Sequence, residues 1–305
     1  MHLIHFILIF FLQVTVANQT ANDLVKSKVK EVETQQFQKI IVPELPASLS
    51  FAGEPVPLED ADIRERLERE LINNCYKHSA TLIILKREGK WKARIQAILK
   101  EQGIPEDFFY LAVAESELDE YALSPAKALG FWQFLKETGK EFGLEINNYV
   151  DQRKDPIAST YAACKYLKAA YEKYGRNWTL AAASYNRGMN GLKKALEAQK
   201  VDSYYDLYLN RETYRYVLRI LALKAIMENP SKYGFHIEDE QRWKAVETER
   251  VWIDSTINNL PEFAKQMGIN YKTLKIYNPW LDSEDYNLVV QKGKGYWFEI
   301  PKTKN

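Results

Sequence analysis

Glu115, in the segment PEDFFYLAVAES, is the residue whose type and setting point most clearly to chemistry. On a helix, Phe108, Leu111 and Glu115 fall at i, i+3 and i+7 and share one apolar face. A carboxyl group on such a face loses water, so its pKa rises and it can act as a general acid near neutral pH. The alternative is a glutamate at the edge of the stripe that reaches solvent or an arginine. Glu117 falls on the far side of the turn, where we expect it to be solvated.

A loop-forming segment with a polar group follows this helix. The break Ser124-Pro125 leads to LGFWQ, in which Gly130 permits close backbone approach. Gln133 offers a donor and an acceptor among apolar neighbours. It is a candidate for ligand binding, and the alternative is an anchor for the loop.

Two further segments place polar groups on or at the ends of helices. LAAASYNRG puts Tyr185 and Asn186 at the end of an apolar helix, where polar groups commonly face a cleft or cap the helix. RETYRYV puts Glu212 and Tyr216 at i and i+4, on one helix face. Tyr185 as a core residue and Glu212 as a helix-start carboxylate facing the dipole are the alternatives.

The composition argues against other kinds of chemistry. The chain has 305 residues and a formal charge of +1, which disfavours nucleic acid as a partner. Only 4 His are present and there is no CxxC, so we expect no metal and no cofactor. Cys75 and Cys164 each follow apolar residues at helical spacing and are predicted to be small core residues rather than a disulfide.

Most of the chain that carries these residues reads as helix. An amphipathic pattern runs from near Asp62 to about Glu228, and strand signals are absent within it. Asp155-Pro156 has the form of an N-cap followed by proline at the first helical position. Gly175 and Gly188 are expected to close helices. This region predicts an all-α domain.

The C-terminal segment changes character. ERVWIDSTI and GYWFEIP are strand-like, and LPEFAKQMGI and YKTLKIYNP between them read as short helices. We therefore predict a small βααβ module after the helical domain.

The N-terminus has the pattern of an export signal. Residues 3–16 are nearly all apolar, a length that suits the core of a signal peptide and is too short to span a membrane. Thr15 and Ala17 fit the small positions before a cleavage site, although the usual charged start is missing. We expect an exported protein of the periplasm or cell envelope. The alternative is a buried first strand or helix.

These patterns divide the chain into five parts. They are a signal peptide (1–17), an extended proline-containing arm (18–61), the helical domain (62–230), a linker (231–245) and the βααβ module (246–305). The arm is expected to lie on the body of the protein or to serve as a linker.

Taken together, five ordered motifs resemble those of the lytic transglycosylases of the soluble-transglycosylase family, which are goose-lysozyme-like (glycoside hydrolase family 23). They are Glu115-Ser116, Gly130-Phe131-Trp132-Gln133, the 151–163 segment DQRKDPIASTYAA, Ser184-Tyr185-Asn186-Arg187-Gly188 and Glu212-Thr213-Tyr214-Arg215-Tyr216-Val217. The approach segment ILKEQGIPEDFFYLAVAES is similar to the membrane-bound lytic transglycosylase D branch, and the βααβ segment resembles a LysM peptidoglycan-binding module. Five motifs in order are far more specific than one.

The resemblance implies a mainly α, lysozyme-like fold and a peptidoglycan lytic transglycosylase. Glu115 is then the single acid/base that cleaves the bond between N-acetylmuramic acid and N-acetylglucosamine and leaves a 1,6-anhydro end. A hydrolytic muramidase and a non-catalytic peptidoglycan-binding scaffold are the alternatives. Glycan strands are the expected partner, and the protein is expected to be a monomer.

The resemblance also implies roles for the loop residues. Ser116 supports Glu115 or the acetamido group of the substrate, and Gln133 with the backbone around Gly130 lines the glycan groove. Family members commonly have glycine at the position of Lys127, where a side chain can narrow or recharge the cleft edge.

The remaining roles fall on the later helices. Tyr185 is expected to hydrogen-bond near Glu115 and the substrate, with Asn186 holding the loop. Glu212 and Tyr216 are expected at the cleft wall. Ser184 replaces the usual alanine. Of the 19 Tyr and 7 Trp, Tyr185 and Trp132 are the first candidates for a functional role.

Overall fold

The computed structural model describes residues 40–302. The predicted signal peptide and residues 18–39 of the predicted arm lie outside this range. The described residues from Pro43 onward belong to one compact unit. No helix in this described part is long and apolar enough to cross a bilayer.

Helices make up most of the described chain and confirm the mainly α prediction. They are α2 (Ala61–Tyr76), α3 (His78–Glu101), α4 (Phe108–Ser116), α5 (Lys136–Glu141), α6 (Pro156–Lys173), α7 (Trp178–Arg187), α8 (Met189–Gln199) and α9 (Arg211–Glu228). Short 3₁₀ turns occur at 152–154, 204–206, 230–233 and 239–241.

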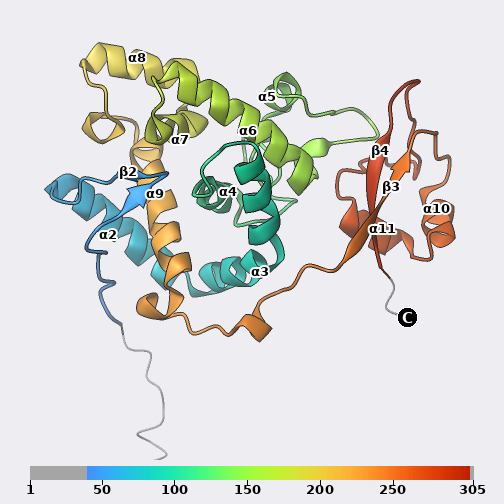
Figure 1. Ribbon diagram of the computed structural model, residues 1–305, viewed down its shortest axis with the longest axis horizontal. Coiled ribbons are helices and arrows are strands. Elements are labelled where there is room, and N and C mark those ends of the chain that lie inside the picture. The colour runs from blue at the N-terminus through green and yellow to red at the C-terminus, as the bar shows by residue number, and fades with distance from the viewer. Residues whose placement is uncertain (1–39, 303–305) are drawn as a thin grey trace, which may run out of the picture. The chain divides into compact units, whose positions relative to one another are not determined.

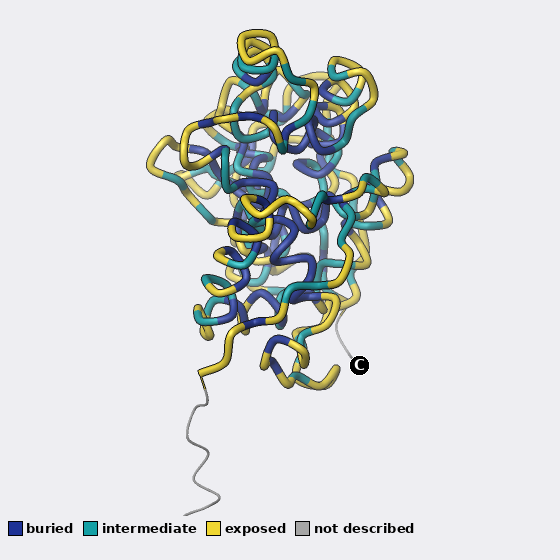
Figure 2. Tube along the Cα trace, turned by 90° about the vertical axis from the view of Figure 1, so that its left-hand side faces the viewer, coloured by how far each residue is buried: buried dark blue, intermediate teal, exposed yellow. Residues whose placement is uncertain are grey.

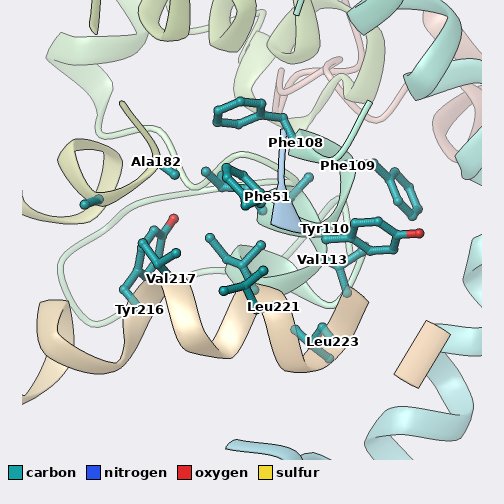
Figure 3. Packing of buried hydrophobic residues seen from close by; sticks show 14 of the residues in the cluster. Phe51, Phe108, Phe109, Tyr110, Val113, Ala182, Tyr216, Val217, Leu221 and Leu223 are labelled. Atoms are coloured by element: carbon teal, nitrogen blue, oxygen red, sulfur yellow. The ribbon is translucent and has the colours of Figure 1, made fainter. Parts of the chain in front are cut away.

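Helix α4 lies at the centre of the helical part, and α9 and α3 pack against it (Figure 1). All six residues from Phe108 to Val113 are buried, because the helix is apolar on every side until its last turn. Helix α9 packs Val217 and Leu221 toward it (Figure 3). A helix enclosed in this way offers solvent only its C-terminal end, where Glu115 lies.

The helix boundaries follow the punctuation in the sequence. The Asp155 carboxylate accepts hydrogen bonds from the backbone N–H of Ile157 and Ala158, and Pro156 occupies the first turn of α6. Gly188 closes α7 with a positive φ, as predicted. Asn177 caps α7 by accepting from Leu180 N at 2.7 Å.

The described part of the proline-containing segment includes a small hairpin, which the sequence did not predict. Strands β1 (Ser50–Phe51) and β2 (Glu54–Pro55) pair antiparallel. Phe51 is fully buried, with its ring 5.0 Å from that of Phe108 in an edge-to-face contact (Figure 3). Of the two alternatives for the arm, residues 43–61 therefore follow the one in which it lies on the body.

The C-terminal module has the predicted βααβ order. Strand β3 (Thr248–Ile253) and strand β4 (Tyr296–Pro301) pair antiparallel, with α10 (Leu260–Gln266) and α11 (Tyr271–Tyr277) between them in sequence. The module has a small hydrophobic core of its own, in which alternate residues of β4 pack with the two helices. Val150, from the loop before α6, is fully buried in this second core.

Buried positions run through the interior of the trace, and exposed positions concentrate in the loops (Figure 2). Cys75 and Cys164 are both buried and unpaired, as expected for small core residues. Burial raises the pKa of the Cys75 thiol to about 11, so neither its setting nor its ionisation suggests reactivity.

Candidate active site

Glu115 lies on the last turn of α4 and is partly buried. The Tyr216 hydroxyl, from α9, donates a hydrogen bond to its Oε1 atom. Burial raises the pKa of the Glu115 carboxyl above its usual value. The Tyr216 hydrogen bond and the positive charge of Arg219 lower that pKa, and the negative charge of Glu212 raises it. Burial prevails, which gives the carboxyl the character of a general acid.

One wall beside Glu115 is formed by the first turns of α9. Tyr216 is only 2% exposed, so its hydroxyl is held in place by packing. Arg219, one turn further along, donates from Nη2 to the Ala114 carbonyl and so fixes the end of α4 to α9. A pocket of about 90 Å³ opens here, lined by Glu212, Arg215, Tyr216 and Arg219.

The end of α7 approaches the same wall. Asn186 donates from Nδ2 to Glu212 Oε1 at 2.9 Å, and its Oδ1 accepts from Thr213 Oγ1 at 2.8 Å. Asn186 therefore ties the end of α7 to the start of α9. Burial raises the pKa of the Tyr185 hydroxyl, and the negative charge of the nearby Glu115 carboxylate raises it further.

The loop between α4 and α5 is held by its own backbone and by Gln133. Gln133 Nε2 donates to the carbonyls of Ala122 and Gly130, at 2.8 and 2.9 Å, so this amide anchors the loop. The Tyr185 hydroxyl donates to the Trp132 carbonyl at 2.8 Å and fastens the loop to α7. These bonds hold the loop to itself and to the helix that carries Tyr185.

Gly130 is required by close backbone packing, as the sequence suggested. Its φ is +79°, and a Cβ atom there would lie 1.9 Å from the Arg153 carbonyl oxygen. Lys127, where family members commonly have glycine, also has a positive φ of 65° and is exposed. A left-handed backbone explains why glycine suits this position.

Two residues are placed differently from what their predicted roles suggest. Trp132 is fully buried, and its indole N–H donates to Thr160 Oγ1 at 2.9 Å, so it is a core residue and is not available for stacking on a sugar. The expectation for Trp132 was therefore wrong, because the tight turn at Gly130 directs the side chain inward. The Ser116 hydroxyl is buried and donates to the Ala112 carbonyl at 3.1 Å, within its own helix.

The structure brings most of the predicted residues together. Glu115, Tyr185, Asn186, Glu212 and Tyr216 converge from α4, α7 and α9, and Gln133 holds the adjoining loop. Arg219 was missed by the sequence reasoning. Its spacing of i+3 from Tyr216 on the same helix is a signal that could have identified it.

Within the described residues, no group of His, Cys, Asp and Glu is arranged to hold a metal ion. The chemistry of this cluster is that of the partly buried Glu115 carboxyl group, with the Tyr216 phenol and the Arg219 guanidinium beside it and a second carboxylate, Glu212, nearby.

Comparison with known proteins identifies two domain families in the chain. The family model of the transglycosylase SLT domain matches residues 92–207, and that of the soluble lytic transglycosylase C-terminal LysM-like domain matches residues 249–304. The chain is 30% identical over 236 residues to membrane-bound lytic murein transglycosylase D of Escherichia coli K12, covering 75% of this chain and 51% of that protein.

Two other relatives are more distant. A putative tributyltin chloride resistance protein of Alteromonas sp. strain M-1 is 26% identical over 98 residues, which are 32% of this chain and 47% of that protein. An inactive mutant of lytic transglycosylase Slt from Pseudomonas aeruginosa is 19% identical, with a TM-score of 0.37, over 51% of this chain and 26% of that chain. The chain spans about half the length of the curated relatives it matches.

Proposed function

The chain carries an SLT transglycosylase domain followed by a LysM-like domain. We propose that the protein is a peptidoglycan lytic transglycosylase with Glu115 as its acid/base. The observation that carries this proposal is the partly buried Glu115 carboxyl, which lies within the matched SLT domain, has a raised pKa and accepts a hydrogen bond from Tyr216. The similarity to lytic murein transglycosylase D supports the same substrate class.

The first step needs an acid. Because its pKa is raised, Glu115 is protonated at a higher pH than an ordinary glutamate. Tyr216 donates to Oε1, so the carboxyl proton is carried by Oε2 and is available to the glycosidic oxygen between N-acetylmuramic acid and N-acetylglucosamine.

The second step needs a base, and the same residue provides it. After giving up its proton, Glu115 is a carboxylate stabilised by the Tyr216 hydroxyl and the Arg219 charge. The bond between C1 of the muramyl sugar and the protonated glycosidic oxygen breaks, and N-acetylglucosamine leaves with that proton on its O4. Glu115 then takes the proton from the C6 hydroxyl of the muramyl sugar as the C6 oxygen bonds to C1. The product is a 1,6-anhydro end, and no second carboxylate is needed as nucleophile.

The proposed supporting residues act through position. Asn186 holds Glu212 against the end of α7, and Glu212 is close enough to influence the charge state of Glu115. We propose that Glu212 steadies positive charge that develops on the sugar. Gln133 and Gly130 shape the loop that lines the groove, and Tyr185 fastens that loop.

We further propose that the protein acts alone, as a monomer, in the cell envelope after export by residues 1–17. The apolar N-terminal segment and the name of the membrane-bound relative support this location. The LysM-like module would hold the enzyme on its polymer substrate.

Purified sacculi, digested with the full chain and analysed by mass spectrometry, test the activity. We expect muropeptides with 1,6-anhydro ends. Glu115→Gln should lower the rate by about 10²- to 10⁴-fold, the usual contribution of a general acid/base. Glu117→Gln, on the exposed side of the same turn, is the matched control and should keep the parent rate.

The other outcomes separate the alternatives. Reducing ends in place of anhydro ends would show a hydrolytic muramidase, which uses the same acid but admits water. Sacculus binding without turnover in the parent chain, unchanged in Glu115→Gln, would show a non-catalytic scaffold.

A further inference from the structure

A groove of about 310 Å³ lies between the LysM-like module and the helical part of the same compact unit. One wall is the outer face of the β3–β4 pair, and the other is formed by α3 and the start of α6. None of the predicted site residues lines it.

The module wall presents two tryptophans side by side. Trp252 and Trp297 are paired across the strands, with ring centroids 5.1 Å apart. Each is 47% exposed, although a tryptophan on a sheet is ordinarily covered. Two indoles that remain half-exposed at the mouth of a groove are typical of a binding surface rather than a core.

The position of Trp252 is set by Gly295. A Cβ atom on Gly295 would lie 2.3 Å from the Trp252 ring, so only glycine allows the indole to pack against the backbone just before β4. The ring is thereby held in place before any ligand arrives, which reduces the entropy lost on binding.

Equal numbers of positively and negatively charged side chains line the groove around Trp252 and Trp297. Lys90, Arg94 and Arg250 carry positive charge at the groove, and Glu120, Asp155 and Glu299 carry negative charge. Arg94 is bonded to Glu299, and the Arg250 guanidinium lies 4.8 Å from the centre of the Trp297 ring. Balanced donors and acceptors favour a neutral ligand with many hydroxyl groups over a polyanion or a cation.

The opposite wall connects the groove to the candidate active site. Trp91 lines the groove, and its ring packs edge-on against Phe131, 5.1 Å away, in the loop that also holds Gln133. Glu120, five residues beyond Glu115, borders the groove as well. A polymer bound here would therefore lie next to the loop that shapes the catalytic cleft.

We propose that this groove binds a neutral β-1,4-linked amino-sugar strand, with Trp252 and Trp297 stacked on the sugar faces and the Arg94–Glu299 pair bonded to sugar hydroxyls. The inference rests on the proposed function for the identity of the polymer. It deepens that function, because module and helical domain then share one saccharide site.

The test uses the full-length chain carrying Glu115→Gln, so that ligand is not cleaved. Indole N–H signals are followed by NMR during titration with chitohexaose, the β-1,4 hexamer of N-acetylglucosamine. We expect the signals of Trp252 and Trp297 to shift together. The signal of Trp243, which is 46% exposed and lies outside the groove, should stay in place and serves as the matched control.

Ile276→Arg provides a second variant that leaves both indoles in place. Ile276 is 46% exposed and lines the groove, so an arginine there should fill the groove without disturbing the core. It should weaken the affinity reported by the two indoles by about five- to tenfold, because the arginine side chain occupies space that the sugar needs.

Several outcomes overturn the proposal. They are unshifted Trp252 and Trp297 signals at saturating chitohexaose, shifts that persist unchanged in Ile276→Arg, and shifts caused by a peptidoglycan stem peptide but not by chitohexaose. The sacculus digestion separates the two proposals. Anhydro products without indole shifts sink this inference alone, and indole shifts without products sink the proposed activity alone.

Discussion

At the scale of single residues, the ionisation of Glu115 is decided by opposing influences. Burial favours the neutral acid, and the Tyr216 hydroxyl and Arg219 favour the carboxylate. A group that must first donate a proton and then accept one benefits from such a balance, since neither form is strongly disfavoured. The effects of Tyr216, Arg219 and Glu212 on the pKa of Glu115 come from three different side chains, so each can be removed by a separate substitution.

The pH profile of the activity should respond to these neighbours with opposite signs. Activity that depends on protonated Glu115 falls as the pH rises through its pKa. Tyr216→Phe removes a bond that lowers this pKa, so the alkaline limb should move to higher pH. Glu212→Gln removes a charge that raises it, so the limb should move to lower pH. The measurement is kcat/KM against pH on soluble muropeptides, and shifts of the same sign in both variants would contradict this account.

Glu115 should also leave a signature in stability. A carboxyl whose pKa is higher in the folded chain stabilises the fold fully below its unfolded pKa, and this contribution is lost as the pH rises through the folded pKa. Glu115→Gln does not ionise, so its Tm should fall less than that of the parent chain between acid and neutral pH. Thermal unfolding at a series of pH values measures this, and parallel curves would disprove it.

Gly130 offers a test of the backbone approach. Gly130→Ala should cost about 2–5 kcal/mol, because a left-handed residue with a Cβ is strained and this Cβ also meets the Arg153 carbonyl. Gly103→Ala is the matched control, with a φ of +67° but nothing within 4 Å, and should cost only about 1–2 kcal/mol. Denaturant unfolding compares them, and equal losses would show that the close approach is unimportant.

At the scale of elements, the N-terminal hairpin supports the helix that carries Tyr185 and Asn186. Glu54, on β2, accepts hydrogen bonds from Trp178 N at 2.6 Å and from Thr179 N at 2.8 Å. These donors are the open N–H groups at the start of α7, where a carboxylate also faces the positive end of the helix dipole. A segment far away in the sequence thus caps this helix together with Asn177.

Removal of this cap should weaken the fold measurably. Glu54→Ala should cost about 1–2 kcal/mol, the usual loss for a helix cap, and lower Tm by about 2–8 °C. Glu59→Ala, at an exposed position just before α2, serves as the control and should change Tm little. If the two variants melt together, the hairpin does not support α7.

At the scale of the whole unit, the module and the helical part are joined by backbone hydrogen bonds and by a residue of one buried in the core of the other. Asp151 N donates to the Trp280 carbonyl and Asp282 N to the Tyr149 carbonyl, both at 2.8 Å. Val150 between them is buried in the core of the module. A module held in this way is part of the same folded body rather than a tethered neighbour.

Val150→Asp should therefore destabilise the unit by more than about 2 kcal/mol, since it places a carboxylate in an apolar core. Val289→Asp is the control, because Val289 belongs to the same module and is 39% exposed. Thermal unfolding reports the difference. Unfolding midpoints that agree for the two variants would show that the loop at Val150 does not join the module core.

The sequence by itself determined the helical domain, the βααβ module and the position of Glu115 on an apolar helix. These features follow from local rules: caps, proline and glycine punctuation, and side-chain period, each of which involves residues within a few positions of one another. Asp155-Pro156, Gly188 and the alternating residues of β4 all behave as their local pattern predicted.

Only the tertiary structure decided which side chains meet. Tyr216 reaches Glu115 across 101 positions of sequence, Phe51 enters the core from a segment without periodicity, and Trp132 turns inward although it lies in a site motif. Such contacts depend on how whole helices pack, and packing is set by the combined shape of many side chains rather than by any one neighbour. The sequence could therefore name the candidate acid, but the environment of Glu115, and with it the ionisation of its carboxyl group, is created by the fold.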